Sequence, residues 1–135
     1  MSEPYMTAVA AAVVLPNEDR VLLVRREEDG AWALPQAALA QGEDVQRAAQ
    51  RAVLEATGVP VALANLVGIY SGAGQLLFVF SAYIYPGHST PAPGVAALGW
   101  LSPAEIEAID DALLQRILAD ARRGIRYPLG MFGAA

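Results

Sequence analysis

The sequence predicts an α/β (α+β) fold in one domain that spans residues 1–135. Short apolar runs typical of strands lie on both sides of an amphipathic helical segment, and further helical segments follow near the end of the chain. The length suits one domain with its own core, and neither an internal repeat nor a linker divides the chain.

Strands are expected where apolar and β-branched residues dominate, at residues 7–15, 21–26, 61–70, 75–85 and 96–101. A turn, Pro-Asn-Glu-Asp at residues 16–19, separates the first two strands, so we expect them to form a hairpin. Residues 75–85 carry apolar side chains on both faces. This pattern indicates a central strand that is covered on both sides.

The first helical segment begins at Asp44, whose carboxylate is suited to cap the free amides of the first turn. Its apolar residues share one helix face: Val45, Ala48, Ala49, Ala52, Val53 and Ala56. Gly58 and Pro60 end this helix. Residues 102–105, Ser-Pro-Ala-Glu, predict the capping box of a second helix, and Asp110-Asp111 precede a third.

The composition excludes several kinds of site. The chain has no cysteine, no lysine and one histidine, His88, so Cys-ligated zinc, multi-histidine metal sites and a P-loop lysine are ruled out. A net charge of −5 disfavours a nucleic-acid partner, which needs a basic face. No apolar run is long enough for a membrane span, and the first residues lack the basic start of a signal peptide. A cytoplasmic location is therefore expected.

Residues 37–59 carry a spaced set of residues: Glu43, Arg51, Val53, Glu55, Gly58 and Val59. This spacing resembles the Nudix box of the MutT/Nudix hydrolases. That box is a Gly, five residues, a Glu, seven residues, then Arg-Glu-U-x-Glu-Glu-x-Gly-U, where U is a bulky aliphatic residue. The preceding Trp32-Ala-Leu-Pro35 resembles the W-x-L-P that leads into the box in many members.

The resemblance implies a Nudix fold, a mixed β-sheet sandwiched between α-helices. It also implies hydrolysis of a nucleoside diphosphate joined to another group, X, with Mg²⁺ or Mn²⁺ bound to the box. Glu55 would be the catalytic carboxylate and metal ligand. The residues implied in binding substrate are Arg25, Arg26 and Arg51. Glu43 and Gly58 would have structural roles in the box.

Several positions depart from the box. Gln36 and Ala37 replace a glycine pair, and Ala52 and Ala56 replace two of the three helix glutamates. Positions 52, 55 and 56 share one helix face, so three carboxylates there would form an anionic patch suited to magnesium. Only Glu55 is present, and residues 85–101 contain no Asp or Glu that would add a ligand. These departures predict impaired or lost hydrolysis.

Three hypotheses remain open from the sequence. A divergent pyrophosphohydrolase would take further metal ligands from outside the box, from residues 27–29, Glu105 or Asp111. A non-catalytic Nudix domain would bind a nucleotide-like ligand or a protein. A structural role would rest on a homodimer formed through apolar faces.

Two smaller alternatives also stay open. Arg25 and Arg26 either contact substrate phosphates or pair with the acids at residues 27–29, and His88 is either a solvated loop residue or a ligand. The tail, residues 125–135, is expected to cover the core, pack on a partner or lie near the cleft.

Overall fold

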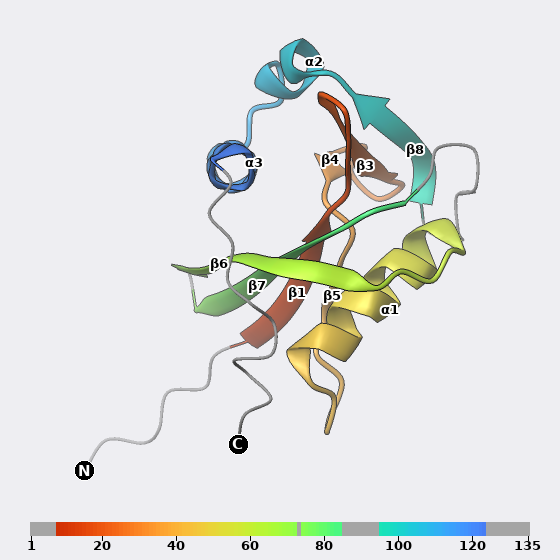
Figure 1. The fold of residues 1–135 in the computed structure, drawn as a ribbon, viewed down its shortest axis with the longest axis vertical. Helices are drawn as coiled ribbons and strands as arrows, with labels where there is room; N and C mark the ends of the chain where they lie inside the picture. Colours follow the sequence, from red (N-terminus) through yellow and green to blue (C-terminus); the bar gives the residue numbers. More distant parts are fainter. Residues whose placement is uncertain (1–7, 73, 85–94, 124–135) are drawn as a thin grey trace.

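The computed structural model describes residues 8–72, 74–84 and 95–123, and these residues form two β-sheets with helices packed around them (Figure 1). The first sheet has the strand order β5 (Gln36–Ala38), β1 (Ala8–Val14), β7 (Gln75–Ala82) and β6 (Leu63–Gly72). In the second, β3 (Arg20–Arg26) pairs with β2 (Pro16–Asn17), β4 (Trp32–Ala33) and β8 (Val95–Leu101).

The first sheet is mixed, as expected. Strand β1 runs parallel to β7, with Ala8 opposite Gln75 and Val14 opposite Ser81. It runs antiparallel to β5, and β6 runs antiparallel to β7. Strand β7 therefore lies between β1 and β6, which confirms the prediction of a central strand from its apolar residues on both faces.

Helix α1 (Val45–Thr57) covers one face of the first sheet, and α3 (Ala112–Arg122) lies on the other side (Figure 1). Alternate residues of β1 enter the two cores, with Ala10, Ala12 and Val14 on the side of α3 and Ala11 and Val13 on the side of α1. Ile106 of α2 (Pro103–Glu107) joins the α3 side. Among the residues described, no helix has the length and apolar character needed to cross a membrane.

The predicted hairpin between residues 7–15 and 21–26 is wrong. Strands β1 and β3 belong to different sheets, and only β2, at Pro16–Asn17, pairs with β3 across the turn. The reason is that β1 is apolar on both faces and is buried best between β5 and β7. The chain therefore passes from one sheet to the other near Leu15.

Other elements differ at their ends. Residues 32–38, where no strand was expected, contain the short strands β4 and β5. Strand β6 continues to Gly72, and β7 ends at Ala82, before the predicted end at residue 85. His88 and the tail at residues 125–135 lie outside the described residues.

The helix ends follow the sequence signals. The Asp44 side chain accepts a hydrogen bond from the Arg47 amide at 2.8 Å and begins α1. Gly58 ends α1 in the left-handed conformation, with φ of 77°, and its amide donates to the Leu54 carbonyl at 2.8 Å. The predicted capping box between Ser102 and Glu105 is present at the start of α2.

Replacing Gly58 with alanine is expected to destabilise the protein by about 1–2 kcal/mol, because a side chain strains the left-handed backbone. Urea denaturation measures this change. Gly72→Ala is the matched control, since Gly72 has an ordinary φ and open space around its Cα. An equal loss of stability in both variants would show that the backbone conformation of Gly58 is not the cause.

Candidate functional site

Arg51 joins the loop before α1 to the helix itself. Its Nε and Nη2 donate to the two carboxylate oxygens of Glu43, both at 2.9 Å. Its Nη1 donates to Glu55 Oε1 at 2.8 Å, and Nη2 also donates to the Ala38 carbonyl at 2.7 Å. The planar guanidinium thus binds one carboxylate through two nitrogens and still reaches a second carboxylate.

Glu43 holds the loop in place. Its Oε1 accepts a further hydrogen bond from the Ala40 amide at 3.0 Å, and only 15% of its side chain is exposed. The hydrogen bonds from Arg51, and then the one from Ala40, lower the pKa of Glu43 to about 2. The same carboxylates raise the pKa of Arg51. Glu43 is therefore ionised at neutral pH, and both of its carboxylate oxygens accept hydrogen bonds within the box.

The two helix positions that depart from the box, Ala52 and Ala56, lie on the buried side of α1. Ala52 is 3% exposed and Ala56 is 8% exposed, whereas the Glu55 side chain is 60% exposed. Methyl groups offer no oxygen to a cation. The face that carries three carboxylates in a Nudix box therefore carries one here, and that carboxylate is paired with Arg51.

The replaced glycine pair lies in regular structure. Gln36 and Ala37 are part of β5, opposite Ala12 and Ala11 of β1. Neither residue has a positive φ, so the backbone here does not require glycine.

The arginines at the end of β3 have different partners. The Arg26 Nη2 donates to Asp29 Oδ2 at 2.9 Å, which is the surface pairing left open by the sequence. The Arg25 guanidinium lies over the Trp32 ring, 5.7 Å from its centroid, and makes no ion pair with the residues described. Arg25 is thus the residue of the two with free hydrogen-bond donors. No hydrogen bond or ion pair joins either arginine to a described residue of α1.

The acidic residues suggested as additional metal ligands mostly have local partners. Asp29 accepts from the Ala31 amide, and that bond is the main reason that its pKa is lowered. Glu105 accepts from the Ser102 amide, which lowers its pKa in the same way. Asp111 caps α3 by accepting from the Leu114 amide. Each of these carboxylates is accounted for by local structure.

Within residues 8–72, 74–84 and 95–123, no group of three or more His, Cys, Asp or Glu side chains is arranged to hold a metal ion. Among the described residues, Glu55 accepts from Arg51, and Arg51 also donates to Glu43. The structure therefore brings together Arg51, Glu43 and Glu55, but not the further acids.

Some contacts in the site and elsewhere in the protein cannot be predicted from the sequence. The Ala38 carbonyl and the Ala40 amide bind Arg51 and Glu43 through backbone atoms, which residue identity does not reveal. Tyr70 donates to Asp120 Oδ2 at 2.7 Å and so links β6 to α3 across 50 residues of sequence. A pattern of spacing within one helix does not predict such a contact.

The carboxyl of Glu43 is expected to titrate near pH 2 in the folded protein, well below its ordinary value of 4.5. A lowered pKa contributes stability that is present above pH 4.5 and is lost as the pH falls through about 2. Carbon-detected NMR of the side-chain carboxyl measures this midpoint. The melting temperature of Glu43→Gln should fall less steeply below pH 4.5 than that of the unchanged protein.

Glu107→Gln is the control for this titration, because Glu107 is exposed and makes no hydrogen bond or ion pair with the residues described. A Glu43 midpoint near 4.5 would contradict the bidentate contact with Arg51.

Comparison with known proteins identifies relatives of this chain. The sequence matches the NUDIX domain family over residues 5–121. It is 31% identical to a MutT-like protein of Streptomyces ambofaciens over 107 residues, which cover 78% of this chain and 70% of the relative. It is 28% identical over 124 residues to a Bacillus subtilis protein provisionally named an 8-oxo-dGTP diphosphatase, covering 87% of this chain and 81% of that protein.

The fold has solved counterparts. A NUDIX hydrolase structure from Nitrosomonas europaea superposes with a TM-score of 0.77 at 29% identity and covers 93% of this chain and 95% of that one. This superposition confirms the mixed sheet between helices. The family match over most of the sequence and the similarity to the MutT-like relative show that the chain belongs to the Nudix family.

Proposed function

We propose that this protein is a Nudix-family domain for nucleoside-diphosphate-X compounds in which metal-dependent pyrophosphohydrolysis is impaired or lost. The observation that carries the proposal is the replacement of two box carboxylates by the buried Ala52 and Ala56. The alternative to this proposal is a domain that binds a nucleotide-like ligand or a protein partner and performs no hydrolysis.

Nudix hydrolases generally use divalent metals, and the donors present here do not fit one. Magnesium takes oxygen ligands in near-octahedral geometry, commonly one or two carboxylates together with substrate phosphates. Glu55 is the only one of the three helix carboxylates of the box that is present, and its Oε1 already accepts from Arg51 at 2.8 Å. A cation would have to displace this contact and would find no second carboxylate on the same helix face.

The nature of the ligand is inferred from the family and from Arg25. The Bacillus subtilis relative is named for a nucleoside triphosphate, which supports a phosphate-containing ligand here. Arg25 is exposed and has no ion pair with the described residues, so its fork of donors is free for phosphate oxygens. Arg26 is less suited to bind phosphate, because it already forms an ion pair with Asp29.

Hydrolysis is expected to be absent or slow with pooled nucleoside triphosphates, ADP-ribose and dinucleoside polyphosphates in the presence of Mg²⁺ or Mn²⁺. Release of phosphate-containing products, separated by chromatography, measures the rate. Glu55→Gln should remove any turnover that is present, because it removes the last of the three helix carboxylates of the box. Fast turnover by the unchanged protein would refute the proposal.

The double variant Ala52→Glu with Ala56→Glu is expected to bind Mn²⁺, which the unchanged protein should not do. Both positions are buried, so the new charges should lower the melting temperature until the cation neutralises them. The matched control, Ala52→Gln with Ala56→Gln, has the same bulk without the charge. If Mn²⁺ changed the melting temperature of both double variants equally, the absence of carboxylates at positions 52 and 56 would not explain why the unchanged protein fails to bind the cation.

ADP-ribose or a nucleoside triphosphate is expected to raise the melting temperature without being cleaved, because a ligand of the native state stabilises it. Arg25→Gln should reduce this shift, whereas Arg116→Gln should not, since Arg116 is an exposed arginine on α3. If no member of the nucleotide panel shifts the melting temperature, the nucleotide-binding alternative is wrong. The protein-binding alternative would then be the one to pursue.

A further inference from the structure

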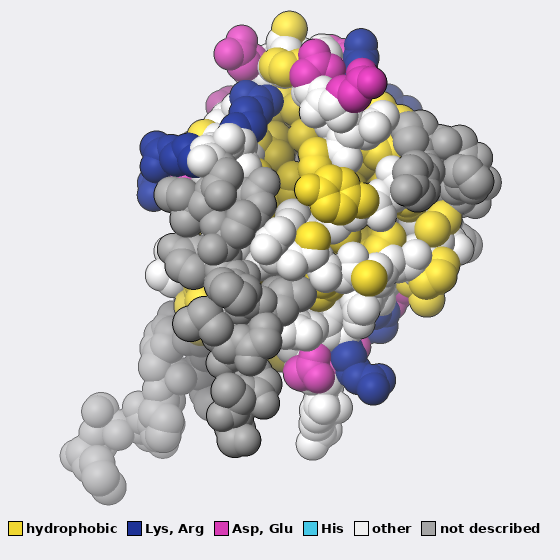
Figure 2. Space-filling model, viewed as in Figure 1, with side chains coloured by type: hydrophobic (Ala, Val, Ile, Leu, Met, Phe, Trp, Pro, Cys, Tyr) yellow, Lys and Arg dark blue, Asp and Glu magenta, His cyan; other side chains and the backbone are white. Residues whose placement is uncertain are grey.

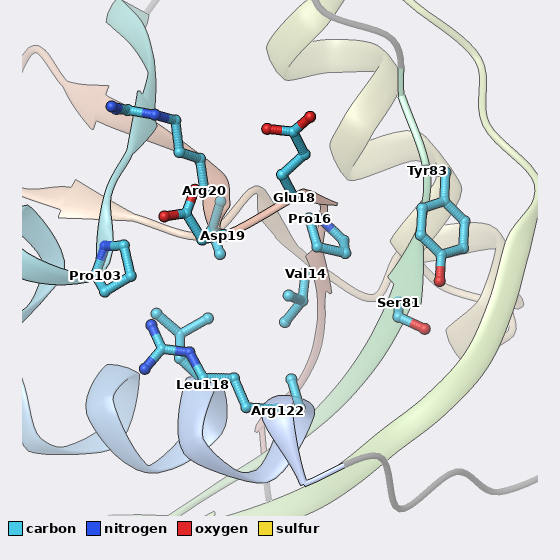
Figure 3. Close-up of a pocket in the computed structure, with 12 residues that line it drawn as sticks. Val14, Pro16, Glu18, Asp19, Arg20, Ser81, Tyr83, Pro103, Leu118 and Arg122 are labelled. Carbon is cyan, nitrogen blue, oxygen red and sulfur yellow. The ribbon is translucent and has the colours of Figure 1, made fainter.

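The geometry points to a second ligand site, at a cavity of about 480 Å³ between α3, the end of β7 and the turn that joins β2 to β3 (Figure 3). The site would take a neutral aromatic molecule that carries an amide-like hydrogen-bonding group. A cavity of this volume lies within the range that holds small organic ligands. None of its lining residues belongs to the Nudix box or is Arg25 or Arg26.

The walls of the cavity are largely apolar. Val14, Val21 and Leu118 supply aliphatic surface. Pro16 and Pro103 add rigid rings, and Tyr83 adds an aromatic ring that is 64% exposed. Figure 2 shows hydrophobic side chains in a hollow between α3 and the turn that joins β2 to β3. Flat apolar walls of this kind suit an aromatic ring.

Ser81 places a polar group in this apolar surrounding. The residue is 4% exposed, and its Oγ is buried without a hydrogen-bond partner among the described residues. Buried hydroxyl groups nearly always have partners, because leaving one unpaired costs free energy. Ser81 lines the cavity, and rotation of its short side chain about the Cα–Cβ bond would turn the covered Oγ toward a ligand that supplies the missing partner. A hydroxyl both donates and accepts, which matches either edge of an amide.

The charges around the cavity balance. Glu18 and Asp19 in the turn between β2 and β3 contribute two negative charges, and Arg20 and Arg122 contribute two positive charges (Figure 3). Arg20 is already held by Glu105 at 3.4 Å. Glu105 lies outside the lining, and among the described lining residues neither sign is in excess, so a neutral ligand is favoured over an anion or a cation.

Three probes of nearly the same shape and different charge test this site. Benzamide is neutral, benzoate is an anion and benzamidine is a cation. In two-dimensional NMR of the full chain, benzamide is expected to shift the amide signals of Val14, Ser81 and Leu118, and to do so at lower concentration than the other probes. Tighter binding of benzoate or benzamidine would overturn the assignment of a neutral ligand.

Variants then locate the bound probe. Ser81→Ala should weaken benzamide binding about threefold to tenfold, because one hydrogen bond is lost. Ala121→Leu should abolish it by filling the cavity, since Ala121 is a lining residue. Ser71→Ala, an exposed serine on β6, is the control and should bind benzamide unchanged.

The melting temperature separates a ligand role of Ser81 from a structural one. Ser81→Ala should leave it unchanged or raise it, because an unpaired buried hydroxyl is removed. A clear fall would show that Ser81 supports the fold and would overturn the proposal, as would benzamide binding that Ala121→Leu does not affect. The shift of the melting temperature by nucleotides should persist in Ala121→Leu. The experiment therefore distinguishes an error in the cavity proposal from an error in the proposed nucleotide binding.

Discussion

Arg51 donates hydrogen bonds to Glu43, Glu55 and the Ala38 carbonyl, and these contacts fix the loop before α1 against the helix. Arg51 carries one positive charge against the two negative charges of Glu43 and Glu55, so these pairs offset part of the negative charge that would attract a cation. Alanine at positions 52 and 56 adds no carboxylate to α1 beside them.

Local sequence signals predicted the helices of the fold well. Asp44 and Gly58 mark the ends of α1, and the Ser102-Glu105 capping box marks the start of α2, because caps depend on atoms within a few residues. Partners between strands were less predictable. The apolar run at residues 7–15 indicated a buried strand but not which strands would pair with it, since both faces look alike.

The sequence likewise predicted some contacts of the candidate site and not others. The spacing from Arg51 to Glu55 places the two on one helix face, and the structure shows them paired. The partners of Arg25 and Arg26 were left open, because residue identity does not say whether an arginine meets Asp29 or the Trp32 ring. The cavity at Ser81 was not foreseen at all, since its lining residues come from distant parts of the chain.

The parallel pairing of β1 with β7 has a consequence for how the chain acquires its structure. Ala8 lies opposite Gln75, so the first strand finds its central neighbour only after β6 and β7 are available. During synthesis on the ribosome, the apolar residues of β1 have to wait for that partner, and pairing between distant segments is slow. The interval before β7 emerges is therefore when this protein is most exposed to aggregation.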